Sequence, residues 1–169
     1  SRDGKPYYLD SEGQYWRIYL FVEGTTSYDQ VEKPSDFYES AVSFGHFQRM
    51  LADFPAKSLH ETIPDFHNTA KRFETFQKAV AADVCGRAAS VKEEIRFVLD
   101  HEAFAHTLCD LEAAGKIPTR VTHNDTKLNN ILIDNATGKG ICVIDLDTVM
   151  PGLAVNDFGD SIRFGASTG

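Results

Sequence analysis

The sequence predicts an α+β fold in which a mainly helical body carries one β-hairpin. Between positions 35 and 115, apolar residues recur at three- and four-residue steps, as on the buried face of amphipathic helices. Two short segments with apolar centres, 129–134 and 140–145, are typical of strands and flank a connector rich in turn-forming residues, which is the pattern of a hairpin. With 169 residues and 42% hydrophobic content, the chain has the size and composition of about one domain.

The first long apolar run of the chain is Tyr15–Val22. A helix is expected after it, with Ser35 or Asp36 placed to cap it. The stripe that this helix is expected to bury consists of Phe37, Ala41, Phe44, Gln48 and Leu51. We assign the stripe to core packing, because the apolar face of a helix mostly serves burial.

Two further helices are expected before position 120. The apolar spacing within Phe73–Val80 marks a short one. The capping-box pattern Ser90–Glu93 opens a longer helix whose apolar residues extend to Leu111, and Gly115 is placed to end it.

A long connector, Asp53–His67, joins the first two of these helices. It contains two prolines, and two of its residues, His60 and His67, are histidines. Long loops of this kind are often functional, so the connector is a candidate to face a substrate. A solvated surface loop is the alternative, and it is equally well supported.

The segment His123–Asn130 combines residue types that suggest phosphoryl transfer. Asp125 and Asn130 have the offset of Asp and Asn in the H-R-D-x-x-x-x-N loop of protein kinases, where the Asp accepts the substrate hydroxyl proton and the Asn holds magnesium. Asp125 is therefore the predicted base. Lys127 is placed to neutralise charge on the transferred group, and His123 is expected to orient the loop rather than to transfer a proton.

The hairpin predicts a metal site beside this loop. If Asp134 lies near Ile141 across the turn, antiparallel register places Asn130 opposite Asp145. Amide and carboxylate oxygens suit magnesium, which substrate phosphates and water usually complete, so Asn130 and Asp145 are the expected ligands. Asp147, two residues further along, could assist the metal, contact substrate or shape the turn, and the sequence favours none of these roles over the others.

The triplet Asp157-Phe158-Gly159 spells the kinase D-F-G motif in a different context. No hairpin leads into it, and it opens a predicted helix that Asn156 or Asp157 can cap. We therefore expect Asp157 to hydrogen-bond to backbone amides near the catalytic loop rather than to bind metal. In the same segment Arg163, like His67 in the connector, is a candidate for a substrate contact or a structural role.

Composition excludes several classes of partner. The net charge of −8 argues against binding to a nucleic-acid backbone or to an anionic membrane surface. No apolar run approaches the ~20 residues that span a bilayer, and no signal peptide is visible. Three well-separated cysteines, Cys85, Cys109 and Cys142, favour reduced thiols and hence a cytoplasmic location.

Three longer motifs resemble those of a known family. They are His123–Asn130, Val143–Gly152 and Asp157–Gly165, and they are similar to the aminoglycoside phosphotransferase and choline kinase-like superfamily. The closest likeness is to the N-acetylhexosamine 1-kinases, which use ATP to phosphorylate the anomeric hydroxyl of N-acetylglucosamine and N-acetylgalactosamine. This likeness extends to Leu51–Pro55 and Leu59–His67.

The resemblance implies a protein-kinase-like fold, of which this chain would be mainly part of the helical C-lobe. It implies ATP and Mg²⁺ as cofactors and a small sugar as substrate. Asp125 would be the base, Asn130 and Asp145 the magnesium ligands, and Lys127 a phosphate or substrate contact. A kinase for another small alcohol (an aminoglycoside, choline or homoserine) and a non-catalytic kinase-like binding module are the alternatives.

The resemblance also implies a second lobe. Residues 1–24 would form the last strand or strands of an N-lobe, with Tyr15–Val22 as its last strand, and the hinge, with Glu23 and Gly24 against adenine. Residues 25–169 would form a partial C-lobe. No glycine-rich phosphate loop or Lys–Glu pair can be located before Asp125. We therefore expect a fragment of a longer kinase that is inactive alone and self-associates through exposed apolar surface.

Overall fold

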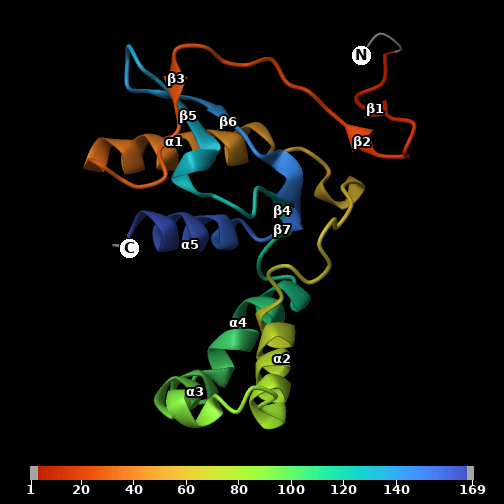
Figure 1. Ribbon diagram of the computed structural model, residues 1–169, viewed down its shortest axis with the longest axis vertical. Helices are drawn as coiled ribbons and strands as arrows, with labels where there is room; N and C mark the ends of the chain where they lie inside the picture. Colours follow the sequence, from red (N-terminus) through yellow and green to blue (C-terminus); the bar gives the residue numbers. More distant parts are fainter. Residues whose placement is uncertain (1–3, 167–169) are drawn as a thin grey trace.

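The computed structural model describes residues 4–166 and shows a body of short strands and two helices, from which a helical unit and a small N-terminal hairpin project (Figure 1). Residues 1–3 of the expected region 1–24 and residues 167–169 of the expected region 25–169 lie outside the described residues. The helices are α1 (Pro34–Met50), α2 (Thr69–Ala82), α3 (Lys92–Asp100), α4 (Glu102–Ala113) and α5 (Ala154–Gly165). The strands are β1 (Tyr8–Leu9), β2 (Tyr15–Trp16), β3 (Thr25–Thr26), β4 (Arg120–Thr122), β5 (Ile131–Asp134), β6 (Gly140–Val143) and β7 (Met150–Gly152). The class is mixed helix and strand, as predicted.

The predicted hairpin is present as β5 and β6, and β3 extends it to a three-stranded antiparallel sheet. Thr25 of β3 pairs with Asp134, at the turn end of β5. A second antiparallel pair, β4 with β7, runs from Arg120 opposite Gly152 to Thr122 opposite Met150. This pair brings the two chain segments that flank the candidate catalytic residues side by side.

The predicted register of the hairpin is wrong by one residue. Ile131 pairs with Val143, so the position opposite Asn130 is Ile144, whose N–H donates to the Asn130 carbonyl at 2.9 Å. The turn is tighter than assumed, because Ile133 pairs with Gly140 and the Asp134 N–H donates to the Lys139 carbonyl, and a bulge between Leu132 and Ile133 then moves the register one residue back toward the predicted one. Asn130 and Asp145 still lie at the same open end of the hairpin.

The first helix, α1, begins earlier than the sequence predicts. Lys33, rather than Ser35 or Asp36, is the N-cap residue, and Pro34 occupies the first helical turn, where its missing N–H costs nothing. Asp36 still serves the helix start, because its carboxylate accepts the Lys33 N–H at 3.2 Å. The capping interaction is therefore made from inside the helix.

Two apolar clusters join α1 to the strands. The first contains buried Phe44, Leu128, Ile131 and Ile133. The second contains Phe47, Ala56 and Val121. Phe44 and Phe47 come from the predicted α1 face or lie next to it, so the amphipathic pattern correctly identified the side of the helix that packs on the hairpin.

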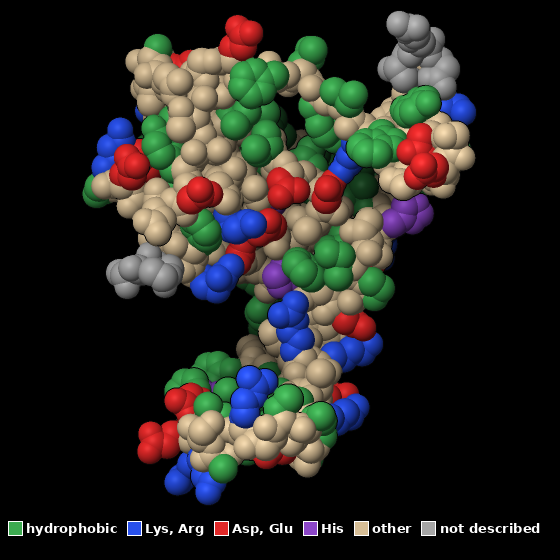
Figure 2. Space-filling view, viewed as in Figure 1, with side chains coloured by type: hydrophobic (Ala, Val, Ile, Leu, Met, Phe, Trp, Pro, Cys, Tyr) green, Lys and Arg blue, Asp and Glu red, His purple; other side chains and the backbone are tan. Residues whose placement is uncertain are grey.

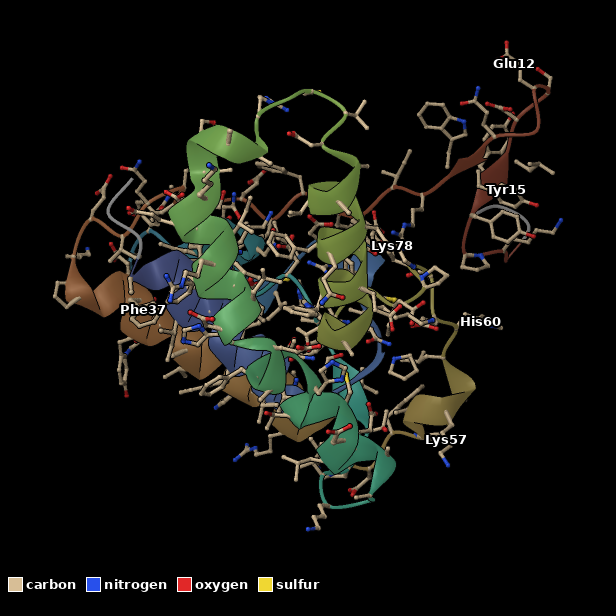
Figure 3. All side chains as sticks on the ribbon, turned by 90° about the horizontal axis from the view of Figure 1, so that it is seen from below. Glu12, Tyr15, Phe37, Lys57, His60 and Lys78 are labelled. Atoms are coloured by element: carbon tan, nitrogen blue, oxygen red, sulfur yellow. The ribbon has the colours of Figure 1, made fainter. Side chains whose placement is uncertain are left out.

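Helix α5 lies alongside α1, close to Phe37 (Figures 1 and 3). A glycine at position 165 permits the approach, because a Cβ atom there would overlap the ring of Phe37. Helix α5 also carries Asp157, but the prediction that Asn156 or Asp157 caps this helix is wrong. The N-cap is Leu153, so Asp157 lies inside the first turns of the helix, on the face that turns toward β4.

The helical unit is formed by α2, α3 and α4, with α2 packed on α4 (Figure 1). The predicted short helix is confirmed as α2, but the predicted long helix is broken at His101, which separates α3 from α4. Gly115 ends α4 as expected, with a φ of 66° and the Lys116 N–H bonded to the Leu111 carbonyl at 2.9 Å. No helix among residues 4–166 is long and apolar enough to cross a membrane.

The predicted strand over Tyr15–Val22 is limited to Tyr15–Trp16. That pair of residues joins β1 in a two-stranded hairpin, which projects from the body with Glu12 and Tyr15 (Figure 3). The rest of the apolar run is extended chain without strand partners among the described residues: Ile18, Leu20 and Phe21 are 94%, 95% and 87% exposed. A strand needs a neighbour to complete its hydrogen bonds.

Candidate active site

The backbone after β4 is held by a carboxylate from α5. Asp157 is buried, and its two oxygens accept the N–H groups of His123 at 2.9 Å and Asn124 at 2.8 Å. These are the backbone hydrogen bonds that the sequence predicted for Asp157. Burial raises the pKa of Asp157, while the two backbone hydrogen bonds, one from Gln48 and the His123 charge all act to lower it.

His123 is fully buried beneath the candidate site. Its ring lies edge-on between Phe44 and Phe47 of α1, with centroid separations of 5.2 and 5.6 Å. Nε2 lies 3.0 Å from the Ile144 carbonyl, and the backbone carbonyl of His123 accepts the Thr148 hydroxyl at 2.7 Å. These contacts tie the loop to α1 and to the end of β6, which fits the orienting role predicted for His123.

The next residues complete the turn of the loop. Asn124 adopts a left-handed conformation with φ of 68°, which Asn tolerates better than most residues, and its Nδ2 donates to the Thr148 carbonyl at 2.8 Å. Thr126 donates its N–H to Asp160 at 2.9 Å and its hydroxyl to the Asp157 carbonyl at 2.7 Å. Asp125 is therefore flanked on both sides by residues that α5 holds.

Three predicted site residues come together at the end of this loop. Lys127 Nζ lies 2.9 Å from Asp125 Oδ2, and Asn130 Nδ2 lies 3.1 Å from the same oxygen. Asn130 also donates to the Asp125 backbone carbonyl at 2.7 Å. The Asp125 and Lys127 side chains remain 25% and 32% exposed, so solvent or a ligand can reach them. The cluster combines a carboxylate, a cation and an amide in one accessible place.

The residues expected to hold magnesium fit that ion in ligand type. Asn130 uses its amide nitrogen on Asp125, so its side-chain oxygen is the atom that could face a metal. Asp145 is exposed directly after Ile144, the residue bonded to the Asn130 carbonyl. Residues 4–166 contain no group of three or more His, Cys, Asp or Glu side chains placed to hold a metal. A site of one amide and one carboxylate would rely on water and phosphate oxygens, as magnesium sites commonly do.

Asp147 faces a different partner from the Asp125 cluster. Its carboxylate forms an ion pair with Arg17 of the N-terminal segment, and its backbone carbonyl accepts the Thr62 hydroxyl at 3.4 Å. In the same region the Ile63 N–H points to the Met150 sulfur at 3.3 Å. The connector and the N-terminal segment therefore both contact the stretch that follows Asp145.

The expected adenine contacts lie at the other end of the hairpin. The Gly24 carbonyl accepts the Asn135 N–H at 2.9 Å, and Gly24 has a φ of 70° in the turn that precedes β3. Glu23 is exposed in the same turn. Because Gly24 is at the Asp134 end of β5 and the cluster is at the Asn130 end, the two are separated by about 13 Å of strand at ~3.3 Å per residue.

The remaining two candidates are not brought to Asp125 by any described contact. Arg163 forms a bidentate pair with Asp160, with Nη2 at 2.7 Å and Nε at 3.1 Å from Oδ1. His67 is half-buried with its ring 4.7 Å from that of Phe66, and its buried Nε2 has no hydrogen-bond partner among the described residues.

The sequence reasoning did not identify three residues that support the loop, namely Gln48, Thr126 and Asp160. Gln48 Nε2 donates to Asp157 Oδ2 at 2.5 Å. A signal for Gln48 was available, since it is the polar member of an otherwise apolar helical stripe. Asp160 follows Asp157 by three residues, so the two carboxylates share one face of α5.

A family comparison agrees with this geometry. The model of the phosphotransferase enzyme family, APH, matches residues 5–169. The chain belongs to this family. Membership gives the chain a kinase-type transferase activity in general terms and implies ATP use, typically with a divalent metal. It also supports the resemblance to the aminoglycoside phosphotransferase and choline kinase-like superfamily and the kinase-like fold.

Proposed function

We propose that this phosphotransferase moves the γ-phosphoryl group of ATP to a sugar hydroxyl, the anomeric hydroxyl of an N-acetylhexosamine. The observation that carries the proposal is that Lys127 Nζ and Asn130 Nδ2 both lie within 3.1 Å of one carboxylate oxygen of Asp125. Such a cluster supplies a proton acceptor, a cation for the phosphoryl oxygens and a hard oxygen ligand. The sugar acceptor rests on the sequence likeness of the three motifs to the N-acetylhexosamine 1-kinases.

Asp125 has the chemistry of a base in this proposal. Oδ2 is engaged by Lys127 and Asn130, so Oδ1 is the oxygen left to accept the proton of an incoming hydroxyl. The loop backbone is fixed through His123, Asn124 and Thr126, which keeps the carboxylate in place without a large rearrangement. Positioning of this kind is the main contribution that a protein makes to phosphoryl transfer.

The nucleotide would lie along the β5–β6 hairpin. Its adenine end would be at Glu23 and Gly24 and its phosphate end at Asn130, an elongated path that suits the shape of ATP. Asn130 and Asp145 would hold a magnesium ion through their side-chain oxygens, and Lys127 would turn from Asp125 to the phosphates. When bound, the ion would supply positive charge that screens the phosphate oxygens.

We also propose that the activity belongs to a protein in which further structure covers the N-terminal segment. Residues 4–124 contain no glycine-rich phosphate loop, and the contacts that such a loop makes are needed to clamp the nucleotide. The exposed Ile18, Leu20 and Phe21 are the side chains that an adjoining sheet would cover. On this account residues 1–24 form the last strand or strands of the N-lobe and the hinge, and residues 25–169 form part of the C-lobe.

The test is a set of ADP-release assays on the full-length protein that contains this chain. The assays use magnesium-ATP in a reducing buffer, which matches the proposed cytoplasmic location. The acceptors are N-acetylglucosamine, N-acetylgalactosamine, choline, homoserine and an aminoglycoside. Turnover with the N-acetylhexosamines alone supports the proposal. Faster turnover with an amino-alcohol or aminoglycoside would mean that the protein is a kinase with a different acceptor. Nucleotide binding without turnover on any acceptor would favour a non-catalytic binding module.

A further inference from the structure

We propose that Gln48 is a positioning residue: its amide fixes the Asp157 carboxylate, and that carboxylate fixes the backbone of the loop that carries Asp125. The inference rests on the proposed function, because it takes Asp125 as the reacting residue. Gln48 lies outside the motifs His123–Asn130, Val143–Gly152 and Asp157–Gly165, on α1, about 75 residues before the loop in the sequence.

The geometry makes α1 the support for two parts of the loop. Phe44, Phe47 and Gln48 share one helix face, since Phe47 and Gln48 follow Phe44 by three and four residues. The two rings pack on His123, and Gln48 Nε2 donates to Asp157 Oδ2 at 2.5 Å. The side chain of His123 is therefore held by α1 directly, and the backbone of His123 is held by α1 through Asp157.

Asp157 holds the loop most strongly as a carboxylate, because a charged acceptor forms stronger hydrogen bonds than a neutral one. Its oxygens receive three hydrogen bonds, from Gln48, from the His123 N–H and from the Asn124 N–H. Oδ2 accepts both the Gln48 amide and the His123 N–H, so a proton on Oδ2 would displace one of these donors, and a proton on Oδ1 would make that oxygen a weaker acceptor for the Asn124 N–H. Burial favours that proton, since it raises the pKa of Asp157, and the hydrogen bond from Gln48 opposes it. Gln48 is neutral, and His123 is the titratable group across from Asp157 whose charge also lowers its pKa.

Removing the Gln48 amide should therefore raise the pKa of Asp157 further. As pH falls, the loop would lose a backbone contact at a higher pH than in the unchanged chain. A hydrogen bond to a charged group is typically worth enough to move a pKa by about one unit or more. The effect should appear at His123 and Asn124 first, because their N–H groups point at the carboxylate.

The experiment follows the amide resonances of His123 and Asn124 by ¹H–¹⁵N NMR in the 169-residue chain, from about pH 4 to 8. Gln48→Met removes the donor at similar volume, and Gln48→Asn is a second variant whose shorter side chain cannot reach Asp157. Gln77→Met is the matched control, since Gln77 is an exposed glutamine on α2. We expect the shared midpoint of the two amides to rise by about one pH unit in both Gln48 variants and to stay unchanged in the control.

An unchanged midpoint in a folded Gln48 variant would overturn the proposal, even if the melting temperature falls, because a purely structural residue lowers stability without moving this titration. In the full-length protein, the acid limb of the kcat profile should move in the same direction and by a similar amount, with KM for ATP unchanged. A midpoint that moves while the acid limb does not would also overturn it. If the full-length protein shows no turnover with any alcohol, the proposed function fails, and the NMR result still decides whether Gln48 fixes the loop.

Discussion

The side-chain amide of Asn130 donates to the carboxylate of Asp125, with Nδ2 3.1 Å from Oδ2. This bond gives the two residues complementary tasks. The nitrogen of Asn130 orients the proposed base, and its oxygen remains to bind a metal. Lys127 shares the same carboxylate oxygen at 2.9 Å, so the cluster is assembled before any ligand binds.

Replacing Asp125 should separate turnover from binding. Asp125→Asn keeps the shape of the side chain and removes the proton acceptor, and general-base contributions are typically ~10²–10⁴-fold in rate. We expect kcat of the full-length protein to fall by that factor, while the affinity for magnesium-ATP measured by calorimetry changes little. Turnover that survives the substitution would remove the assignment of Asp125 as base.

Metal dependence should distinguish Asp145 from Asp147. Asp145→Asn removes a charge from the proposed magnesium pair, so nucleotide binding should require a higher magnesium concentration. Asp147→Asn is the matched comparison, because Asp147 lies two residues away and pairs with Arg17. A larger shift of the magnesium midpoint in the Asp147 variant than in the Asp145 variant would mean that the ligand has been assigned to the wrong carboxylate.

His123 should matter for folding more than its position in the motif suggests. Its ring is fully buried between two phenylalanines, so His123→Ala leaves a cavity and should lower the free energy of unfolding by about 2–4 kcal/mol. His46→Ala, at an exposed position of α1, should change it by less than about 0.5 kcal/mol. Urea unfolding of the two variants provides the measurement, and equal effects would contradict the role given to the His123 ring.

The contact between α1 and the hairpin turn predicts a pH dependence of stability. The hydrogen bond from Lys139, at 2.7 Å, lowers the pKa of Glu39 below its ordinary value, and the Gly140 N–H contributes at 3.2 Å. A depressed carboxyl pKa adds stability that is present above the ordinary pKa and is lost as pH falls through the folded-state pKa. We expect this part of the acid destabilisation to be absent from Glu39→Gln, as measured by urea unfolding at stepped pH. Parallel pH curves for the two chains would contradict the coupling.

The packing of α5 on α1 can be tested with two glycines of the same helix. Gly165→Ala places a methyl group against the Phe37 ring, and overpacking of this kind typically costs about 1–3 kcal/mol. A Cβ atom at Gly159 meets no neighbour, so Gly159→Ala should stabilise the helix by about 0.5–1 kcal/mol. Thermal unfolding should show opposite signs for the two, and a neutral Gly165→Ala would mean that the helices are more loosely packed than described.

Local patterns predicted which candidate residues lie together better than they predicted the strand pairing. The spacing of Asp125, Lys127 and Asn130 placed them together because a short loop leaves few alternatives, and the apolar spacing located α1 and α2. The hairpin register failed because the turn closes between Asp134 and Lys139 rather than between Asp134 and Ile141, and the bulge between Leu132 and Ile133 recovers only one of the two residues. The strand predicted at Tyr15–Val22 has the right side chains, but a strand also needs a partner, and pairing is not a local property.

The support of the loop was only half visible in the sequence. Asp157 was expected to bind backbone amides, and it does, but the helix that carries it begins at Ala154 rather than at a polar cap. Gln48 joins this carboxylate from a position 109 residues away in the sequence. Such a contact depends on how α1 and α5 meet, which requires the assembled fold.

The most direct test of the central claim is ³¹P NMR of the γ-phosphoryl group of magnesium-ATP with N-acetylglucosamine and the full-length protein. The account predicts a new sugar 1-phosphate resonance that depends on magnesium and disappears in Asp125→Asn, with no transfer by the 169-residue chain alone. A protein that binds magnesium-ATP but leaves the γ-phosphoryl group in place with every alcohol offered would contradict it.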